Sequence, residues 1–285
     1  MAANEIILVV LITLGFSIAV IFAKTSLNKM DAKGFVKFYF LGAAIVIFIE
    51  FLTLHSMGLA NITFSFNAWA ILLSAAFGAA AAFAGFIGMK RIHAGVSGTI
   101  FNLQGPLIAL FGVLFYRIYP SNMVFMGILI SVIGLIIMGL DRGLKATVRF
   151  TSPFLLLSVS PLLWALEWIL FSFTSSAAPV FLTFLLYLFI FIILWGLNYV
   201  FRPLSEGPSR TRFLAIAGGS FAGVANGSYG IFITYYGPAL TGIVTLMSVP
   251  VSVLLAFLIL KERYNGPEFL GMVLVCIGLV VSTIL

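Results

Sequence analysis

Residues 238–282 read PALTGIVTLMSVPVSVLLAFLILKERYNGPEFLGMVLVCIGLVVS, and the same pattern occurs earlier in the chain. Shifted back by 144 positions, this stretch aligns without a gap on residues 94–138, so that Pro250 matches Pro106 and Gly271 matches Gly127. Proline and glycine constrain or release the backbone, so these matches carry more weight than the many matched leucines. The chain therefore contains an internal duplication.

Composition indicates a membrane protein. The chain has 285 residues, of which 62% are hydrophobic and 8% are charged. A soluble domain of this size could not bury so much apolar surface. A helix needs about 20 apolar residues to cross the roughly 30 Å of hydrocarbon in a bilayer. We therefore expect an all-α polytopic membrane protein with a single membrane domain, residues 1–285.

Ten apolar segments can be defined, and the short turns between them favour helix hairpins over membrane β-strands. The first segment lacks a preceding basic region and a following small-residue cleavage site, so we interpret it as a membrane helix rather than a signal peptide. The predicted helices span residues 5–23, 35–54, 68–89, 95–115, 123–140, 153–173, 180–201, 213–236, 239–260 and 267–285.

The basic residues predict the topology. Of the 15 lysines and arginines, all but Arg117 lie in connections that follow odd-numbered helices or, for Lys37, at the start of the helix after such a connection. Because cytoplasmic connections are enriched in Lys and Arg, these connections are expected in the cytoplasm and both termini on the outer side of the cytoplasmic (inner) membrane. The net charge of +7 is explained by this bias. We therefore expect the lipid bilayer, and no nucleic acid, as a partner.

The duplication and the charge bias together predict an inverted repeat. Five helices are an odd number, so a second five-helix copy would enter the membrane in the opposite orientation. The two inverted five-helix repeats are expected at about residues 1–144 and 145–285. This organisation is typical of secondary transporters, which bind substrate near the membrane midplane between the halves. A duplicated membrane scaffold or receptor is the alternative.

The pattern of a mid-helix proline, a Lys-Glu-Arg turn and two glycines seven residues apart resembles the EamA-like branch of the drug/metabolite transporter (DMT) superfamily. Here these features are Pro250, residues 261–263, Gly271 and Gly278. The first half departs from the pattern at residues 117–119, Arg-Ile-Tyr, where the family has an acidic residue. The resemblance implies ten transmembrane helices and transport of amino acids, other small metabolites, sugars or drugs. Many members are drawn with cytoplasmic termini, whereas the charges here predict external ones.

Glu167 is the outstanding ionisable residue of the predicted helices. A carboxylate deep in the membrane costs about 2.5–3.5 kcal/mol, so it should face the bundle interior or water. Helical spacing places Trp164 and Trp168 on the same stripe. Together they could bind an ammonium group by charge and cation–π contact, or the carboxyl group could carry a coupling proton. A structural hydrogen bond between helices is the alternative.

Further polar residues mark candidate cavity walls. The 144-residue shift matches Ser248 in the ninth helix with Gln104 in the fourth, so the two copies present polar groups on equivalent faces. Asn102 lies on another face, but Pro106 deprives its carbonyl group of a helical donor, and Pro250 is placed likewise. The two prolines are therefore candidate hinges. Bonding between packed helices is the alternative for the polar groups. The remaining candidates for substrate contact are Thr245, Asn226 and Tyr229.

The absence of several patterns narrows the function. The sequence has no His/Cys/Asp cluster for a metal, no P-loop and no Ser–His–acid set, so we expect neither an enzyme nor a cofactor. The predicted function is alternating-access, secondary active transport of small organic metabolites, with amino acids and other amino-bearing compounds as candidates. A coupling proton is a candidate partner, and a monomer is sufficient. The alternatives are a divalent-cation or channel-like permease of the same superfamily and a lipid flippase or scaffold subunit.

Overall fold

The computed structural model describes residues 3–60, 62, 66–117, 121–145, 152–174, 178–201, 205–264 and 266–283, and regular structure in these ranges is entirely helical. This confirms the predicted fold class at the level of an all-α protein. The elements are α1 (Ala3–Leu27), α2 (Ala32–Ser56), α3 (Ala68–Met89), α4 (Ala94–Phe101), α5 (Gln104–Tyr116), α6 (Asn122–Lys145), α7 (Ser152–Ser172), α8 (Pro179–Val200), α9 (Ser209–Leu246), α10 (Ser248–Leu260) and α11 (Gly266–Thr283).

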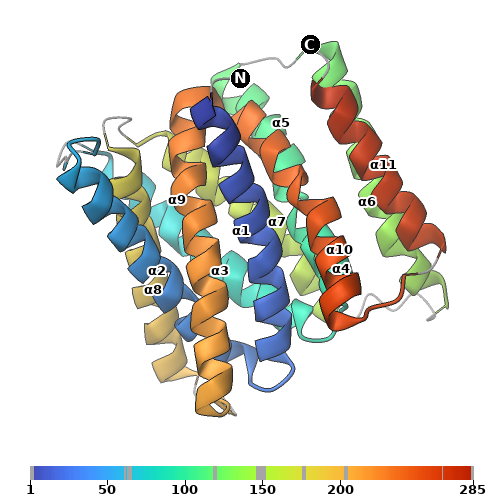
Figure 1. Ribbon diagram of the computed structural model, residues 1–285, viewed down its shortest axis with the longest axis horizontal. Coiled ribbons are helices and arrows are strands. Elements are labelled where there is room, and N and C mark those ends of the chain that lie inside the picture. The colour runs from blue at the N-terminus through green and yellow to red at the C-terminus, as the bar shows by residue number, and fades with distance from the viewer. Residues whose placement is uncertain are drawn as a thin grey trace.

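Several helices of the bundle have the length and apolarity of membrane spans. The first turn of α1 and the last turn of α11 lie at the same end of it, as an even number of crossings requires (Figure 1). The count of ten crossings stays a prediction. Within the described residues, seven segments are long and apolar enough to cross a membrane: Glu5–Leu27, Ala32–Ser56, Ala68–Met89, Ala94–Tyr116, Leu155–Ser172, Pro179–Val200 and Leu240–Leu260.

The predicted fourth and ninth helices are interrupted rather than continuous. The fourth is divided between α4, which ends at Phe101, and α5, which begins at Gln104; the ninth is divided at Met247, between α9 and α10. Each break lies just before a proline, Pro106 or Pro250. A proline has no N–H for the carbonyl group four residues earlier, which explains why the helix is interrupted there.

The 144-residue shift is reproduced in the backbone of the two broken helices. Leu103 and Met247, which the shift pairs, each donate their N–H to the carbonyl group three residues earlier, at 3.0 Å and 3.1 Å. The helices that follow also end alike, with left-handed backbone at Arg117 (φ 54°) and Lys261 (φ 55°). The duplication inferred from the sequence therefore extends to local geometry.

The carbonyl group of Asn102 is not left without a donor. It accepts the N–H of Gly105 at 3.1 Å, within the tight turn between α4 and α5. The turn therefore supplies a donor in place of the helical one that Pro106 removes.

A chain reversal lies inside α9. The backbone is non-helical at Gly237 (φ 78°, ψ 170°), where the absence of a side chain permits a positive φ, and Pro238 follows directly. Figure 1 shows the chain rising along most of α9 and descending after this point. The two helices predicted at residues 213–236 and 239–260 are therefore separate in space, although α9 runs through both.

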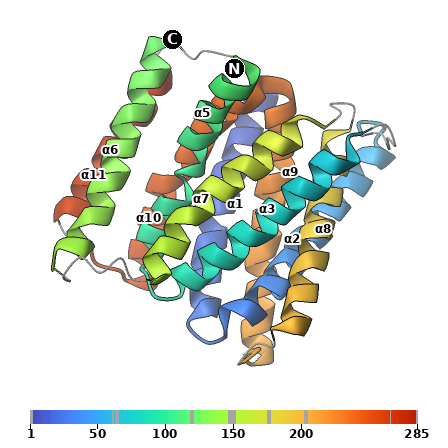
Figure 2. The same cartoon turned by 180° about the vertical axis from the view of Figure 1, so that it is seen from behind.

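Helices α6 and α11 form an antiparallel pair along one side of the bundle (Figures 1 and 2). A Cβ atom on Gly134 would lie 2.6 Å from the carbonyl oxygen of Gly271, and one on Gly278 would lie 2.5 Å from that of Gly127. The shift of 144 positions converts one contact into the other. The two helices thus pack as a pseudo-twofold pair, and the glycines are needed because the backbones touch.

An apolar groove separates this pair from the rest of the bundle on the α10 side. Its volume is about 890 Å³, and α10 contributes Pro250 and Phe257 while α11 contributes Phe269, Met272 and Cys276. In a membrane-spanning bundle, such a surface suits the acyl chains of lipids rather than water.

Helices α2 and α9, which both contribute residues to the central cavity described below, pack closely against each other. Gly219 of α9 lies against the carbonyl group of Tyr39, and Gly42 of α2 lies against that of Ile216. Gly223 continues the contact, since an added Cβ would lie 2.8 Å from the oxygen of Ala43. The glycines of α9 therefore allow the two backbones to approach closely.

Candidate functional site

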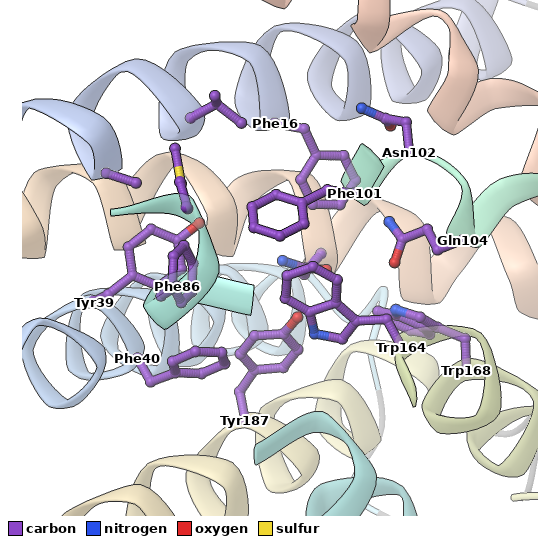
Figure 3. Close-up of a pocket in the computed structure, with 14 residues that line it drawn as sticks. Phe16, Tyr39, Phe40, Phe86, Phe101, Asn102, Gln104, Trp164, Trp168 and Tyr187 are labelled. Atoms are coloured by element: carbon purple, nitrogen blue, oxygen red, sulfur yellow. The ribbon is translucent and has the colours of Figure 1, made fainter. Parts of the chain in front are cut away.

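A cavity of about 70 Å³ lies at the centre of the bundle, and Figure 3 shows its wall. The space accommodates a few waters rather than an organic molecule, so the protein is closed around it in this conformation. Eight of the fourteen lining residues are aromatic, and none carries a formal charge. The cavity is lined by Phe16, Val20 and Ala23 of α1, Tyr39 and Phe40 of α2, Phe86 and Met89 of α3, Phe101 of α4, Asn102, Gln104 of α5, Trp164 and Trp168 of α7, Tyr187 of α8 and Asn226 of α9.

The break between α4 and α5 brings two carboxamides to the cavity. In a continuous helix, side chains two positions apart point about 200° apart, which would send Asn102 away from Gln104. The turn at Leu103 removes this constraint, and both side chains line the cavity (Figure 3). The prediction that Asn102 lies on another face is therefore wrong, because it assumed an unbroken helix.

Hydrogen bonds distinguish the three carboxamides. Asn102 is bonded at both ends of its carboxamide: its Nδ2 donates to the Gly98 carbonyl at 2.7 Å, and its Oδ1 accepts from the Ser248 hydroxyl at 2.9 Å. Asn226 donates its Nδ2 to the Ala222 carbonyl at 2.7 Å. Gln104 has no hydrogen-bond partner for its side chain among the described residues. A ligand would therefore find free polar groups on Gln104 and Asn226.

Both halves of the chain match one family of proteins. The model of the EamA-like transporter family matches residues 3–140 and again residues 151–284. The chain belongs to the EamA-like transporter family. The resemblance noted in the sequence is thereby confirmed, and this EamA-like chain is a multi-pass membrane transporter of the DMT superfamily. Its family consists of transporters rather than enzymes.

The fold of the EamA-like chain is shared with a solved structure titled "Crystal structure of protein". The two superpose with a TM-score of 0.73, over 99% of this chain and 98% of that chain, at 17% sequence identity. At that identity the likeness concerns the fold. No curated protein sequence matches the chain significantly.

Glu167, the principal candidate of the sequence, lies behind the cavity wall of the EamA-like bundle. It is 0% exposed and packs against α3, where a Cβ atom on Gly78 would lie 2.8 Å from its Cδ. Neither carboxyl oxygen has a hydrogen-bond partner within the described part of the chain. The predicted cluster with Trp164 and Trp168 is thus divided, since the tryptophans line the cavity and the carboxyl group does not.

Three other candidates also lie outside the cavity lining. Thr245 donates its hydroxyl to the Gly242 carbonyl at 2.7 Å, where α9 crosses α5. Ser248 bonds to Asn102 as described above. Tyr229 is fully buried and packs against Trp168, with ring centroids 4.4 Å apart. These residues hold the two broken helices and the tryptophan in place.

The sequence missed most of the aromatic wall. Six of the lining rings were not predicted: Phe16, Tyr39, Phe40, Phe86, Phe101 and Tyr187. With 30 phenylalanines and 9 tyrosines in the chain, no spacing distinguishes these rings from those that face lipid.

A carboxylate of the second half caps a helix of the first half. Glu262, in the connection between α10 and α11, accepts the N–H of Ala94 at 2.8 Å and that of Gly95 at 3.1 Å. These N–H groups begin α4, so the negative charge also meets the positive end of the helix dipole. His93 Nδ1 lies 3.9 Å from the same carboxylate.

The equivalent contact, between the connection that follows α5 and the start of the second half's broken helix, cannot form. By the 144-residue shift, Glu262 corresponds to Ile118, which lies outside the described residues, and Ala94 corresponds to Pro238, which has no N–H. A side-chain acceptor and a backbone donor are thus both missing from the equivalent positions. The departure from the family pattern at residues 117–119 therefore makes the two ends of the transporter unequal.

Proposed function

We propose that the chain is a secondary active transporter of small organic metabolites, acting by alternating access of two inverted halves. The observation that carries the proposal is the central cavity, which is lined by helices of both halves and by Asn102 and Gln104 at the break between α4 and α5. Substrate sites of inverted-repeat transporters lie at the repeat interface, where discontinuous helices expose polar groups. Pro106 and Pro250 are the proposed flexible points, because each follows a break.

The amino-bearing substrates considered from the sequence depend on Glu167. That carboxyl group lies behind the cavity wall in this conformation, so the geometry supports small metabolites in general better than ammonium compounds. Its buried position instead suits the role of a proton carrier for coupled transport. A small molecule, the bilayer and a coupling proton are then the partners, and one chain is sufficient.

The alternative functions receive less support from the same residues. A divalent-cation route requires several oxygen ligands, and carboxylates in particular, whereas the cavity lining has no charged residue. A flippase would use the groove between α10 and α11 with basic groups at headgroup depth, and none of the described residues that line the groove is basic.

Transport by purified protein in proteoliposomes tests the proposal. A panel of radiolabelled small metabolites should be screened for uptake and for counterflow exchange, with and without a pH gradient. Saturable uptake of at least one compound above the level of empty liposomes supports a transporter. Ion flux without any organic substrate would instead support a channel-like permease.

The inverted orientation makes a prediction about topology. A reporter that is active only in the cytoplasm should be silent when fused after Leu285 and active when inserted within residues 146–150. The reason is that basic connections follow odd-numbered helices and remain inside. The opposite pair of results would place both termini in the cytoplasm and leave the duplication unaffected.

The Glu262 contact makes a prediction about alternating access. Glu262→Gln weakens the cap that joins the halves, and such caps contribute about 0.5–2 kcal/mol, so opening at this end should become roughly 2- to 30-fold more favourable. The measurement is labelling of a cysteine placed at Met89 by a membrane-impermeant thiol reagent, in a Cys276→Ser background. Arg263→Gln is the matched control and should label like the parent. Equal labelling of the Glu262→Gln protein would show that this contact does not hold the end closed.

A further inference from the structure

We propose that the central cavity selects a planar aromatic ligand without charged groups, held by its aromatic rings and by the carboxamides of Gln104 and Asn226. This inference rests on the proposed transport function and names the substrate class of the same site. It is carried by three features of the cavity: its rings, its lack of charge and its unpaired polar groups.

Rings meet in the cavity from several helices and offer both faces and edges. Trp164 lies edge-on to Phe101, with centroids 4.9 Å apart and planes at 80°. On another side, Phe40 stacks with Tyr187, with centroids 5.7 Å apart and planes at 19°. Aromatic rings prefer offset-stacked and edge-to-face neighbours. An added flat ring could therefore continue the existing arrangement without disturbing it (Figure 3).

The lack of charge decides between neutral and ionic ligands. An anion would find no basic side chain in the lining, and an ammonium group would find no carboxylate, since Glu167 lies behind the wall. Cation–π contact with aromatic faces stabilises a bound cation by about 0.5–2 kcal/mol. Removing an ion from water costs several kcal/mol when no counter-charge is present. The balance favours a neutral ligand.

The unpaired carboxamides require polar atoms on the ligand. Gln104 offers both an acceptor and donors, and Asn226 offers an Oδ1 with no protein donor among the described residues. A purely apolar ring would leave these groups without hydrogen bonds once water is displaced, which is costly in a buried site. The favoured ligand is therefore an aromatic ring that carries an amide, hydroxyl or similar neutral group. The present volume of about 70 Å³ means that the walls separate to admit it.

A ligand series with one ring and four charge states tests this inference. The probes are phenylacetamide (neutral), phenethylamine (cation), phenylacetate (anion) and phenylalanine (zwitterion), and cyclohexylacetamide is the probe without aromaticity. Thermal unfolding of the purified full-length protein in detergent at pH 7 measures binding independently of transport. We expect phenylacetamide to stabilise the protein saturably, with an affinity at least about tenfold greater than that of any other probe.

Two variants connect the result to the cavity. Gln104→Leu is expected to weaken phenylacetamide binding about tenfold, because it removes the free carboxamide. Asn198→Leu is the matched control: Asn198 is a buried carboxamide of α8 that does not line the cavity, so this variant should bind like the parent. If the Gln104→Leu protein does not fold, the probe series on the unaltered protein still decides.

The outcomes separate this inference from the function on which it rests. Tightest binding of phenethylamine would establish a cation site and overturn the inference, as would equal binding of cyclohexylacetamide or no stabilisation by any probe. Stabilisation by phenylacetamide without transport of any compound in proteoliposomes would sustain the ligand class and contradict the transporter. Transport of a charged metabolite without phenylacetamide binding would support the transporter and overturn the proposed ligand class.

Discussion

The Glu167→Gln protein is expected to lose proton-driven accumulation of substrate to the level of empty liposomes while keeping substrate exchange. Glu167 is 0% exposed and neither of its oxygens is paired within the described residues, so it is placed to take up and release a proton rather than to hold a fixed ion pair. Glutamine has nearly the same shape but cannot carry the proton. The measurement is uptake with and without a pH gradient, beside counterflow at equal pH.

Glu50→Gln is the matched control, because Glu50 is also a carboxylate on a membrane helix but is only half-buried, against Gly227 of α9. It should keep accumulation near the parent level. Loss of both accumulation and exchange in the Glu167→Gln protein would instead indicate a substrate-binding carboxylate. Wild-type accumulation would remove α7 from the coupling mechanism and leave the cavity lining unaffected.

Gly219→Ala should destabilise the protein more than the same substitution at any other described glycine. The new Cβ would overlap the carbonyl oxygen of Tyr39, which belongs to the backbone of α2 and cannot turn aside. Overpacking of this kind typically costs about 1–3 kcal/mol, and more where only backbone can yield. We expect a lower unfolding temperature and a loss of monodisperse protein on size-exclusion chromatography.

Gly196→Ala provides the comparison, because Gly196 of α8 has no neighbour within 4 Å of an added Cβ among the described residues. Alanine has a higher helix propensity than glycine by about 1 kcal/mol, so this change should leave stability equal or slightly increased. A Gly219→Ala protein as stable as the Gly196→Ala protein would mean that α2 and α9 separate easily.

The sequence alone determined the duplication and the membrane-helix architecture. Long apolar runs separated by short basic turns leave few other solutions, because backbone groups in lipid must be bonded within the helix. The same shift pairs Gly127 with Gly271 and Gly134 with Gly278, and these four glycines lie in the contact between α6 and α11. A residue that has no side chain is conspicuous in a sequence, and its packing role follows directly.

Five of the nine residues predicted from the sequence to contact substrate line the cavity, and substrate contact itself stays a prediction. Asn102, Gln104, Trp164, Trp168 and Asn226 line the cavity. Buried carboxamides and tryptophans need polar partners, so their placement at an internal cavity could be expected. That Asn102 joins Gln104 depended on the break at Leu103, which helical periodicity does not reveal.

The tertiary structure decided the rest. In a helix that is apolar on every side, periodicity shows which residues share a face but not which neighbour that face meets. The packing of α7 against α3 places Glu167 behind the cavity wall. The rings that line the cavity come from several helices that meet there. Likewise, Glu262 meets the start of α4 because the two halves fold together, a contact between residues 168 positions apart. Such pairings arise from the shapes of whole helices, which no local stretch of sequence contains.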